Sequence, residues 1–156
     1  MPLHVALLEP RTPEVSADLA RRCVTADASL HLVAPAFAID DPAFRDGQID
    51  WHALDWWIHP MWRDFRDAMS RERCLYFAAD VDRDPVDAPF RPNSVLVFGN
   101  EALHLPDKIR EKYPDRVFGL PRAAKRKERD VAAAIELTLQ FVAKRAAPTA
   151  RNPRRR

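Results

Sequence analysis

Short apolar runs that favour β-strands alternate along this chain with segments of helical spacing, and this alternation constrains the fold more than any other feature. Five runs predict strands, over residues 3–10, 29–35, 74–80, 94–100 and 116–121. Four further segments predict helices, over residues 14–26, 61–72, 105–113 and 128–145. Strands that alternate with helices are typical of a mostly parallel sheet flanked by helices. The sequence therefore predicts the α/β class.

A single domain accommodates this pattern. The chain has 156 residues, of which 47% are hydrophobic, so it is long enough to bury one sizeable core. We expect residues 1–145 to form this domain. Residues 146–156 contain prolines and a run of arginines, and we expect them to form a basic, disordered tail.

The polar, proline-bearing segment 37–59 is predicted to be a connection rather than a regular element. It contains three tryptophans, Trp51, Trp56 and Trp57. Exposed indoles in a loop are costly, so we expect them to be covered. Packing within the monomer and packing against a partner subunit both satisfy this requirement.

Charge and cysteine content exclude several classes of protein. There are 25 Lys and Arg residues against 23 acidic residues, so the net charge of +2 does not by itself indicate a nucleic-acid ligand. No apolar run approaches the roughly 20 residues that cross a bilayer. The two cysteines, Cys23 and Cys74, and the five scattered histidines fit no disulfide or metal pattern. We therefore expect a cytoplasmic protein with reduced thiols, no metal and no membrane contact.

Basic residues are nevertheless concentrated in the segment 122–129, directly after the last predicted strand. Such a run is often only a solvated surface, but beside a strand end it can also bind RNA phosphates. The candidate RNA-binding residues are Arg122, Lys125, Arg126, Lys127 and Arg129.

Ligands of open parallel sheets bind where the carboxyl ends of the strands meet. Three loops leave such ends, at residues 9–10, 99–101 and 119–121. Gly99 and Gly119 lie in two of them, although the chain has only three glycines. Glycine lets a ligand approach the backbone closely, so these loops are candidate binding loops, and ordinary strand-ending turns are the alternative.

The order of several segments resembles the small SPOUT-class RNA 2′-O-ribose methyltransferases, and within them the proteins that methylate the wobble nucleotide of tRNA anticodons. The resemblance rests on HVALLEP at residues 4–10, RRC at 21–23, DGQIDWH at 46–52, VLVFGNEALHLP at 95–106 and VFGLP at 117–121. It extends from Leu3 to about Arg145.

This resemblance implies a deep C-terminal trefoil knot, a homodimer, a tRNA substrate and S-adenosylmethionine as the cofactor. It places Arg21 where the family has an arginine implicated in activating the ribose hydroxyl, so Arg21 is the candidate catalytic residue. The cofactor is held in such proteins mainly by backbone groups of three strand-end loops. The corresponding candidate residues are Ala79, Gly99, Glu101, Leu120 and Glu128.

Three departures from the family pattern keep other functions open. Val15 to Asp18 stand where the family has Asn-x-Gly-Asn, and Leu103-His104 replace an Arg-Gly pair. Ala132 and Ala133 replace a serine and an asparagine. The sequence is therefore compatible with an active methyltransferase, with a SPOUT homodimer that has lost catalysis and acts as a scaffold, and with an RNA-binding protein that uses no cofactor.

Overall fold

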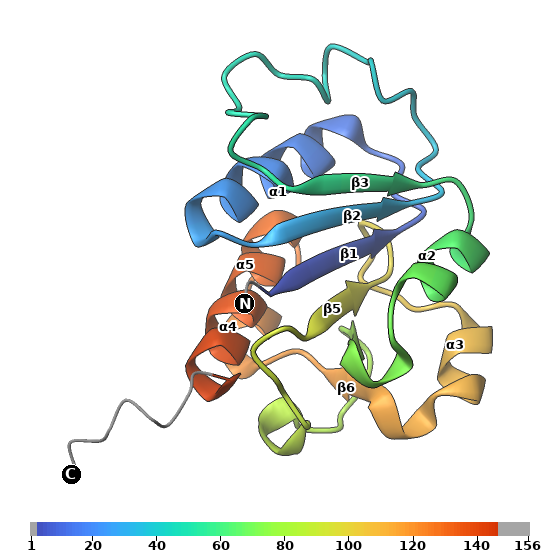
Figure 1. Ribbon diagram of the computed structural model, residues 1–156. Coiled ribbons are helices and arrows are strands. Elements are labelled where there is room, and N and C mark those ends of the chain that lie inside the picture. Colours follow the sequence, from blue (N-terminus) through green and yellow to red (C-terminus); the bar gives the residue numbers. More distant parts are fainter. Residues whose placement is uncertain (1–2, 147–156) are drawn as a thin grey trace, which may run out of the picture.

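Six parallel strands form one sheet. A computed structural model describes residues 3–146, and the structural statements below concern these residues. The strands are β1 (His4–Leu8), β2 (Ser29–Val33), β3 (Trp56–His59), β4 (Cys74–Ala78), β5 (Val95–Phe98) and β6 (Val117–Gly119). Their order is β3-β2-β1-β5-β4-β6, and every neighbouring pair is parallel (Figure 1). The predicted α/β class is thereby confirmed.

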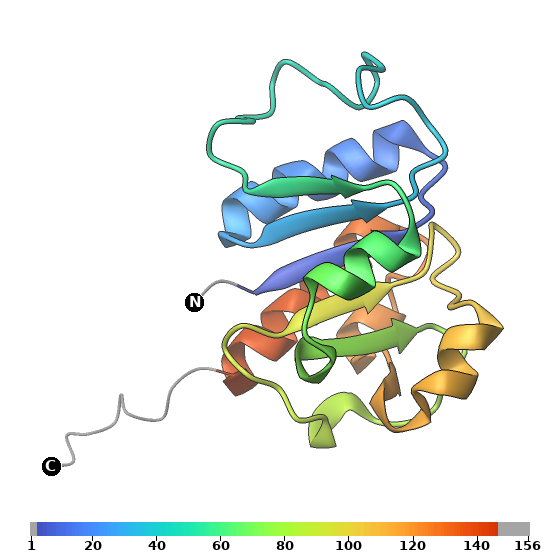
Figure 2. The ribbon, with the colours of Figure 1, turned by 45° about the vertical axis from the view of Figure 1, so that its right-hand side comes forward.

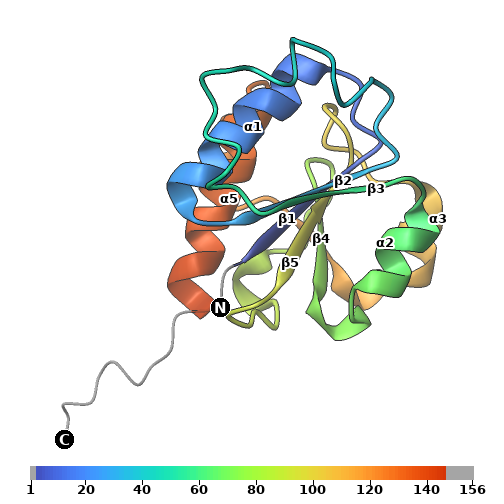
Figure 3. The same ribbon diagram turned by 45° about the horizontal axis from the view of Figure 1, so that its top comes forward.

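Helices cover both faces of this sheet. They are α1 (Pro13–Ala26), α2 (Trp62–Ala68), α3 (Asp107–Lys112), α4 (Arg122–Lys125) and α5 (Val131–Ala146). Figure 3 shows α1 and α5 together on one face and α2 and α3 on the other. All strands point their carboxyl ends toward the same edge of the sheet, where the loops to α1, α3 and α4 begin.

Alternation of side chains along each strand builds two cores. In β1, Val5 and Leu7 pack on the side of α1 and α5, whereas Ala6 and Leu8 pack on the opposite side. The apolar side chains of β4 and β5 are all buried, which is why their sequences read as continuous hydrophobic runs.

The segment 37–59 contains a strand that the sequence prediction missed. β3 forms because Trp56 to His59 pair with Leu30 to Val33 of β2. Trp51 and Trp56 pack within the monomer: their ring centroids lie 4.9 Å apart, and Arg45 lies over both rings. Trp57 points to the other face of the sheet and is 45% exposed. Figure 2 shows the rest of the segment arching over α1.

The last helix also differs from the prediction. The basic segment forms the short helix α4, and α5 begins at Val131 instead of Glu128. Val131, Ile135, Leu139 and Val142 are all buried, as their spacing predicts. α5 includes Ala146, the first residue of the predicted tail, and the remaining tail residues lie outside the described part of the chain.

The helix α2 also differs from the prediction, because it starts at Trp62 and not at Met61. Phe65 is buried, but Met61, which precedes the helix, is 58% exposed.

A row of three histidines crosses the face of the sheet that α2 partly covers. His4 Nδ1 lies 2.8 Å from His31 Nε2, and His31 Nδ1 lies 2.9 Å from His59 Nε2. The exposed Trp57 stacks on His31 with its ring centroid 4.8 Å away. Burial, reinforced by the neighbouring histidines and Arg73, lowers the pKa of His31 to about 3. The row is therefore neutral at physiological pH.

Candidate active site

The loops that follow β4, β5 and β6 meet at the carboxyl edge of the sheet because these strands are neighbours. The N–H of Ala79, after β4, donates to the carbonyl of Leu103 in the loop after β5, at 3.0 Å. The N–H of Gly119 donates to the carbonyl of Arg83 at 2.7 Å. The ammonium group of Lys125 binds the carbonyl of Ala79. The structure thus brings together the loops to which the resemblance assigns Ala79, Gly99 and Leu120.

Gly99 is a point of close approach within the loop after β5, and Gly119 is one between β6 and the loop after β4. A Cβ on Gly99 would lie 2.1 Å from the carbonyl oxygen of His104, and one on Gly119 would lie 2.1 Å from that of Val81. Neither glycine has a positive φ, so steric space and not backbone conformation requires them. The atoms that approach them belong to the chain itself, and direct contact of Gly99 with a cofactor stays a prediction.

Glu101 connects the β5 loop to the start of α1. Its carboxylate accepts hydrogen bonds from the backbone N–H of Arg11, at 2.9 Å, and from that of Thr12, at 2.7 Å. α1 has no side-chain cap of its own at Thr12, so this carboxylate supplies negative charge near the positive end of the helix. Glu101 thereby positions the β1–α1 loop.

The two residues that replace the family's Arg-Gly pair have structural contacts. Leu103 is 1% exposed and adopts a left-handed conformation, with φ of 53°. His104 Nδ1 lies 3.3 Å from Asp80, whose carboxylate also accepts a hydrogen bond from Arg110 at 2.6 Å. The hydrogen bond from Arg110 is the main reason why the pKa of Asp80 is lowered. These contacts connect the β5 loop to α3 and to the end of β4.

A cavity of about 520 Å³ opens between the loops after β4 and β6, and we call it the loop cavity. Leu120 and three of the predicted RNA-binding residues, Arg122, Lys125 and Arg126, line it. Lys127, Glu128 and Arg129 are exposed and lie outside its lining. Ala79, Gly99 and Glu101 do not line it either, although Lys125 connects Ala79 to it.

Two cations of the loop cavity were not predicted from the sequence. Arg83 lies over the Phe118 ring, 4.4 Å from its centroid, and Arg145 of α5 lies 3.8 Å from the centroid of Phe141. Asp82 and Asp84 also line the cavity, so five cations face two carboxylates. Arg145 lies 16 residues after the end of the basic segment 122–129, and no local pattern indicates that it joins this site.

Arg21 lies on α1 and is not part of the lining of the loop cavity. Its guanidinium binds Asp18 at 2.7 Å, and its side chain is 52% exposed. The neighbouring Arg22 bridges Asp18, at 3.2 Å, and Glu136 of α5, at 2.6 Å. Arg22 therefore holds α1 against α5, while Arg21 remains accessible from outside.

The start of α5 carries few polar side chains. Asp130 accepts a hydrogen bond from the N–H of Ala133 at 3.3 Å and so caps the helix. Ala132 is 2% exposed and packs in the core. No hydroxyl or amide replaces the serine and asparagine that the family pattern has here.

In residues 3–146, no group of three or more His, Cys, Asp or Glu side chains is arranged to hold a metal ion. No helix within the same residues is both long and apolar enough to cross a membrane. Burial raises the pKa of Cys23 to about 12 and that of Cys74 to about 11, so both thiols are protonated and unreactive at neutral pH.

Comparison with known proteins identifies the family. The SpoU rRNA Methylase family matches residues 2–138. The chain belongs to this family. It is 32% identical over 117 residues to a tRNA (cytidine(34)-2'-O)-methyltransferase of Acidovorax sp. (strain JS42), and the match covers 71% of each protein. A tRNA (cytidine(34)-2'-O)-methyltransferase of Burkholderia ambifaria is 29% identical over 116 residues, which cover 72% of this chain and 74% of the relative.

Solved structures of the SpoU type share the fold. One, described as giving insight into 2-OH methylation of C/U34 on tRNA, matches with a TM-score of 0.78 and 22% identity over 94% of this chain and 91% of that one. The SpoU methyltransferase AviRb from Streptomyces viridochromogenes, in complex with AdoMet, matches with a TM-score of 0.75 and 20% identity. That match covers 92% of this chain and 57% of AviRb. These likenesses confirm the predicted SpoU-type architecture of the sheet and its helices.

Proposed function

We propose that this SpoU-family protein transfers a methyl group from S-adenosylmethionine to the 2′-hydroxyl of a ribose in tRNA. The relatives named above are described as acting on cytidine 34, so the wobble nucleotide is the proposed target. One observation in the structure carries the proposal. The family's three binding loops converge beside the loop cavity, in which five cations can receive a polyanionic substrate.

The loop cavity fits the cofactor in size. Its volume of about 520 Å³ lies within the range of small-ligand sites. Leu120 would hold the cofactor through backbone groups, while Gly99 and Glu101 shape the adjoining loops. Ala79 and Glu128 complete the proposed cofactor-binding set.

When bound, S-adenosylmethionine supplies an electrophilic methyl group on its sulfonium sulfur. The residues of the chain must then align the ribose hydroxyl with that methyl group and assist removal of its proton. We assign this task to Arg21, which is accessible on α1 and whose guanidinium would donate a hydrogen bond to the hydroxyl oxygen while the proton passes to water. The proposed phosphate contacts are Arg122, Lys125, Arg126, Lys127 and Arg129.

We further propose that the protein is a homodimer and that the three loops form a trefoil knot. A second copy would bring its own Arg21 to a cavity that the first copy's Arg21 does not line. The close contact at Gly119 supports the knot, because this glycine admits the backbone of Val81 in the loop after β4. A single domain over residues 1–145, a basic tail from residue 146 and a cytoplasmic location complete the proposal. Sedimentation equilibrium tests the dimer, and a monomer at assay concentrations would contradict it.

Calorimetry with S-adenosylmethionine tests cofactor binding directly. No binding at about 1 mM cofactor would refute the enzyme proposal, since a dissociation constant of about 1 mM is already at the weak end of specific recognition. If the cofactor binds, transfer of labelled methyl groups to bulk tRNA is the next measurement. Arg21→Ala should abolish transfer and leave cofactor affinity nearly unchanged, and normal transfer by this variant would remove Arg21 from the mechanism.

One observation favours a second candidate function, a catalytically inactive SpoU-type scaffold that binds RNA. Leu103 and Ala132, which replace polar residues of the family, are both buried in the core. They cannot contact a substrate from those positions. Cofactor binding without methyl transfer to any tRNA, together with retained tRNA affinity, would favour this candidate.

A further inference from the structure

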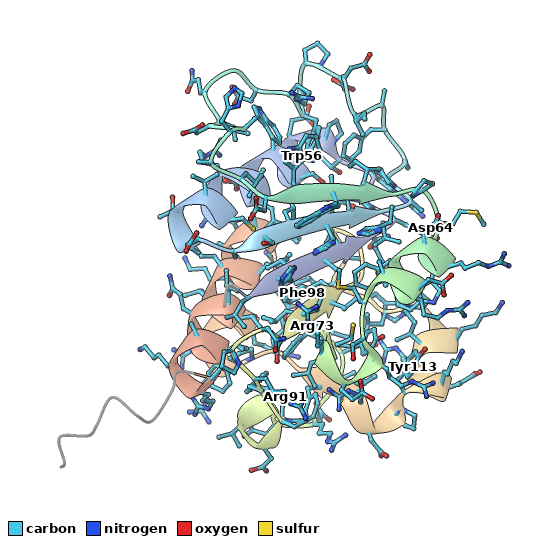
Figure 4. All side chains as sticks on the ribbon, viewed as in Figure 1. Trp56, Asp64, Arg73, Arg91, Phe98 and Tyr113 are labelled. Carbon is cyan, nitrogen blue, oxygen red and sulfur yellow. The ribbon has the colours of Figure 1, made fainter. Side chains whose placement is uncertain are left out.

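A groove lies on the other face of the sheet, between α2 and α3, and no role has been assigned to it above. A cavity of about 450 Å³ adjoins a second one of about 330 Å³, and both are lined by Trp62, Arg66, Lys112 and Tyr113. We call the two together the α2–α3 groove. Figure 4 shows Asp64 on α2 and Tyr113 at the end of α3, on the same side of the sheet.

Aromatic side chains form one wall of the α2–α3 groove. The Tyr113 ring stacks on Tyr76 with centroids 5.4 Å apart and planes within 6° of parallel, so its position is fixed. Trp62 lies 6.5 Å from Tyr76 and is only half-buried. An indole that is held in place and partly exposed offers a stacking surface for a planar ligand.

The rim of the α2–α3 groove is cationic. Arg66, Lys108 and Lys112 are exposed along it, and Arg71 lies 5.1 Å from the centroid of the Tyr113 ring. Glu9 is the single carboxylate in the lining of the two cavities. Arg66 has a loose contact with Asp67, at 3.8 Å and well exposed, which leaves it available to another anion. Four cations against one carboxylate favour an anionic ligand.

The groove also reaches the edge of the sheet at which the RNA is proposed to bind. Glu9 and Ala34, which follow β1 and β2, line the groove and adopt left-handed conformations with φ of 49° and 50°. Such conformations are uncommon in residues other than glycine and cluster at binding sites. Pro106, at the end of the loop that contains Gly99 and Glu101, lines the groove as well. A chain of nucleotides bound at the mouth of the loop cavity can therefore continue around this edge.

We propose that the α2–α3 groove binds an unpaired nucleotide of the RNA substrate, with its base on Trp62 and its phosphates at Arg66, Lys108 and Lys112. This inference rests on the proposed function, because it takes the substrate to be RNA. A planar base and a phosphate match the aromatic wall and the cationic rim at the same time. An acidic peptide would use the rim but would leave the indole without a stacking partner.

Fluorescence anisotropy with a labelled RNA hairpin that has an unpaired loop tests the groove. The double variant Arg66→Glu/Lys112→Glu should bind this hairpin at least about ten-fold more weakly than the wild type. The matched control is the double variant Arg63→Glu/Lys144→Glu, which makes the same charge change at two exposed positions, on α2 and α5, that do not line the groove. Its affinity should stay within about two-fold of wild type. Equal losses in both variants would overturn the proposal.

Trp62→Leu tests the stacking contact separately from charge. It should weaken binding of the looped hairpin about ten-fold but leave binding of a blunt RNA duplex of equal length unchanged, because a paired base cannot stack on the indole. Thermal unfolding of each variant verifies that it is folded. Equal effects on hairpin and duplex, or binding of a poly-glutamate peptide as tight as that of the hairpin, would overturn the assignment to a nucleotide.

Failure of this inference can be told apart from failure of the proposed function. The groove variants should retain the wild-type affinity for S-adenosylmethionine, because they lie on the opposite face of the sheet from the loop cavity. If the groove variants transfer methyl groups and bind the hairpin with normal affinity, the groove proposal fails and the proposed enzyme function stands. If the groove variants bind the hairpin more weakly but the wild type transfers no methyl groups, the proposed enzyme function fails and the groove proposal stands.

Discussion

The carboxylate of Glu101 accepts a hydrogen bond from the backbone N–H of Thr12 at 2.7 Å, across 89 positions of sequence. With the second bond, to the N–H of Arg11, it fixes the loop after β5 to the start of α1. A single side chain therefore connects a proposed cofactor loop to the helix that carries Arg21.

Glu101→Gln should destabilise the protein, because a neutral amide makes weaker hydrogen bonds than a carboxylate and places an N–H group against a backbone donor. We expect a loss of about 1–3 kcal/mol in the free energy of unfolding, measured by urea titration. Glu111→Gln, an exposed change on α3, is the control and should have little effect. Equal stability of the two variants would contradict the role given to Glu101.

Gly99→Ala should be strongly destabilising, because the new methyl group would collide with the backbone of His104. The backbone cannot move aside as a flexible side chain would, so we expect a loss of more than about 2 kcal/mol or failure to fold. Gly47→Ala provides a matched comparison, since no atom lies within 4 Å of a Cβ there. Its stability should lie within about 0.5 kcal/mol of the wild type in the same urea titration.

The histidine row should make stability depend on pH. Burial lowers the folded-state pKa of His31 to about 3, below its ordinary value of 6.5, so the unfolded chain binds the proton more readily. The stabilisation is complete above pH 6.5 and is lost progressively as the pH falls toward 3. From about pH 7.5 to about pH 5, His31 alone should lower the free energy of unfolding by about 2 kcal/mol.

His31→Leu should make this loss of stability on acidification shallower, which chemical denaturation at several pH values can measure. Burial also lowers the pKa values of His4 and His59, so these residues act in the same direction. The stability of the variant should therefore still depend on pH to some extent. His52→Gln changes an exposed histidine and serves as the control. A variant as sensitive to acid as the wild type would show that His31 does not contribute.

Arg122 and Arg126 should contribute to RNA affinity through charge alone, because both are exposed at the mouth of the loop cavity. Replacing either by alanine should weaken tRNA binding to a similar extent for different tRNAs. The slope of log affinity against log salt concentration should become shallower by about 1 per residue. Lys144→Ala, on the last turn of α5, should leave this slope unchanged. An altered preference among tRNAs would instead indicate a direct contact with a base.

Sequence patterns were sufficient for the elements whose side chains are buried on both faces of the sheet. β1, β2, β4 and β5 read as apolar runs because helices cover both of their faces. β3 was missed because only one of its four residues is buried and it follows a long polar connection. Its aromatic and β-branched residues, Trp56, Trp57 and Ile58, were the available signal.

The structure brings the predicted site loops together, while the role of their residues in binding stays a prediction. Family motifs indicated the segments that contain Ala79, Gly99 and Leu120, and the order β5-β4-β6 places these segments side by side. Family motifs could not predict the contacts between residues that are distant in the sequence. Arg83 and Arg145 enter the loop cavity because of how the loop after β4 and the end of α5 pack, which no local spacing encodes.

The two edges of the sheet are formed by short strands. β3 has four residues and is followed by Pro60, and β6 has three residues and is followed within two positions by Pro121. Each edge therefore offers few free N–H and C=O groups to a strand of another molecule, and proline cannot extend the pairing. A parallel sheet with so many buried apolar strands is thus protected against edge-to-edge aggregation at both of its open sides.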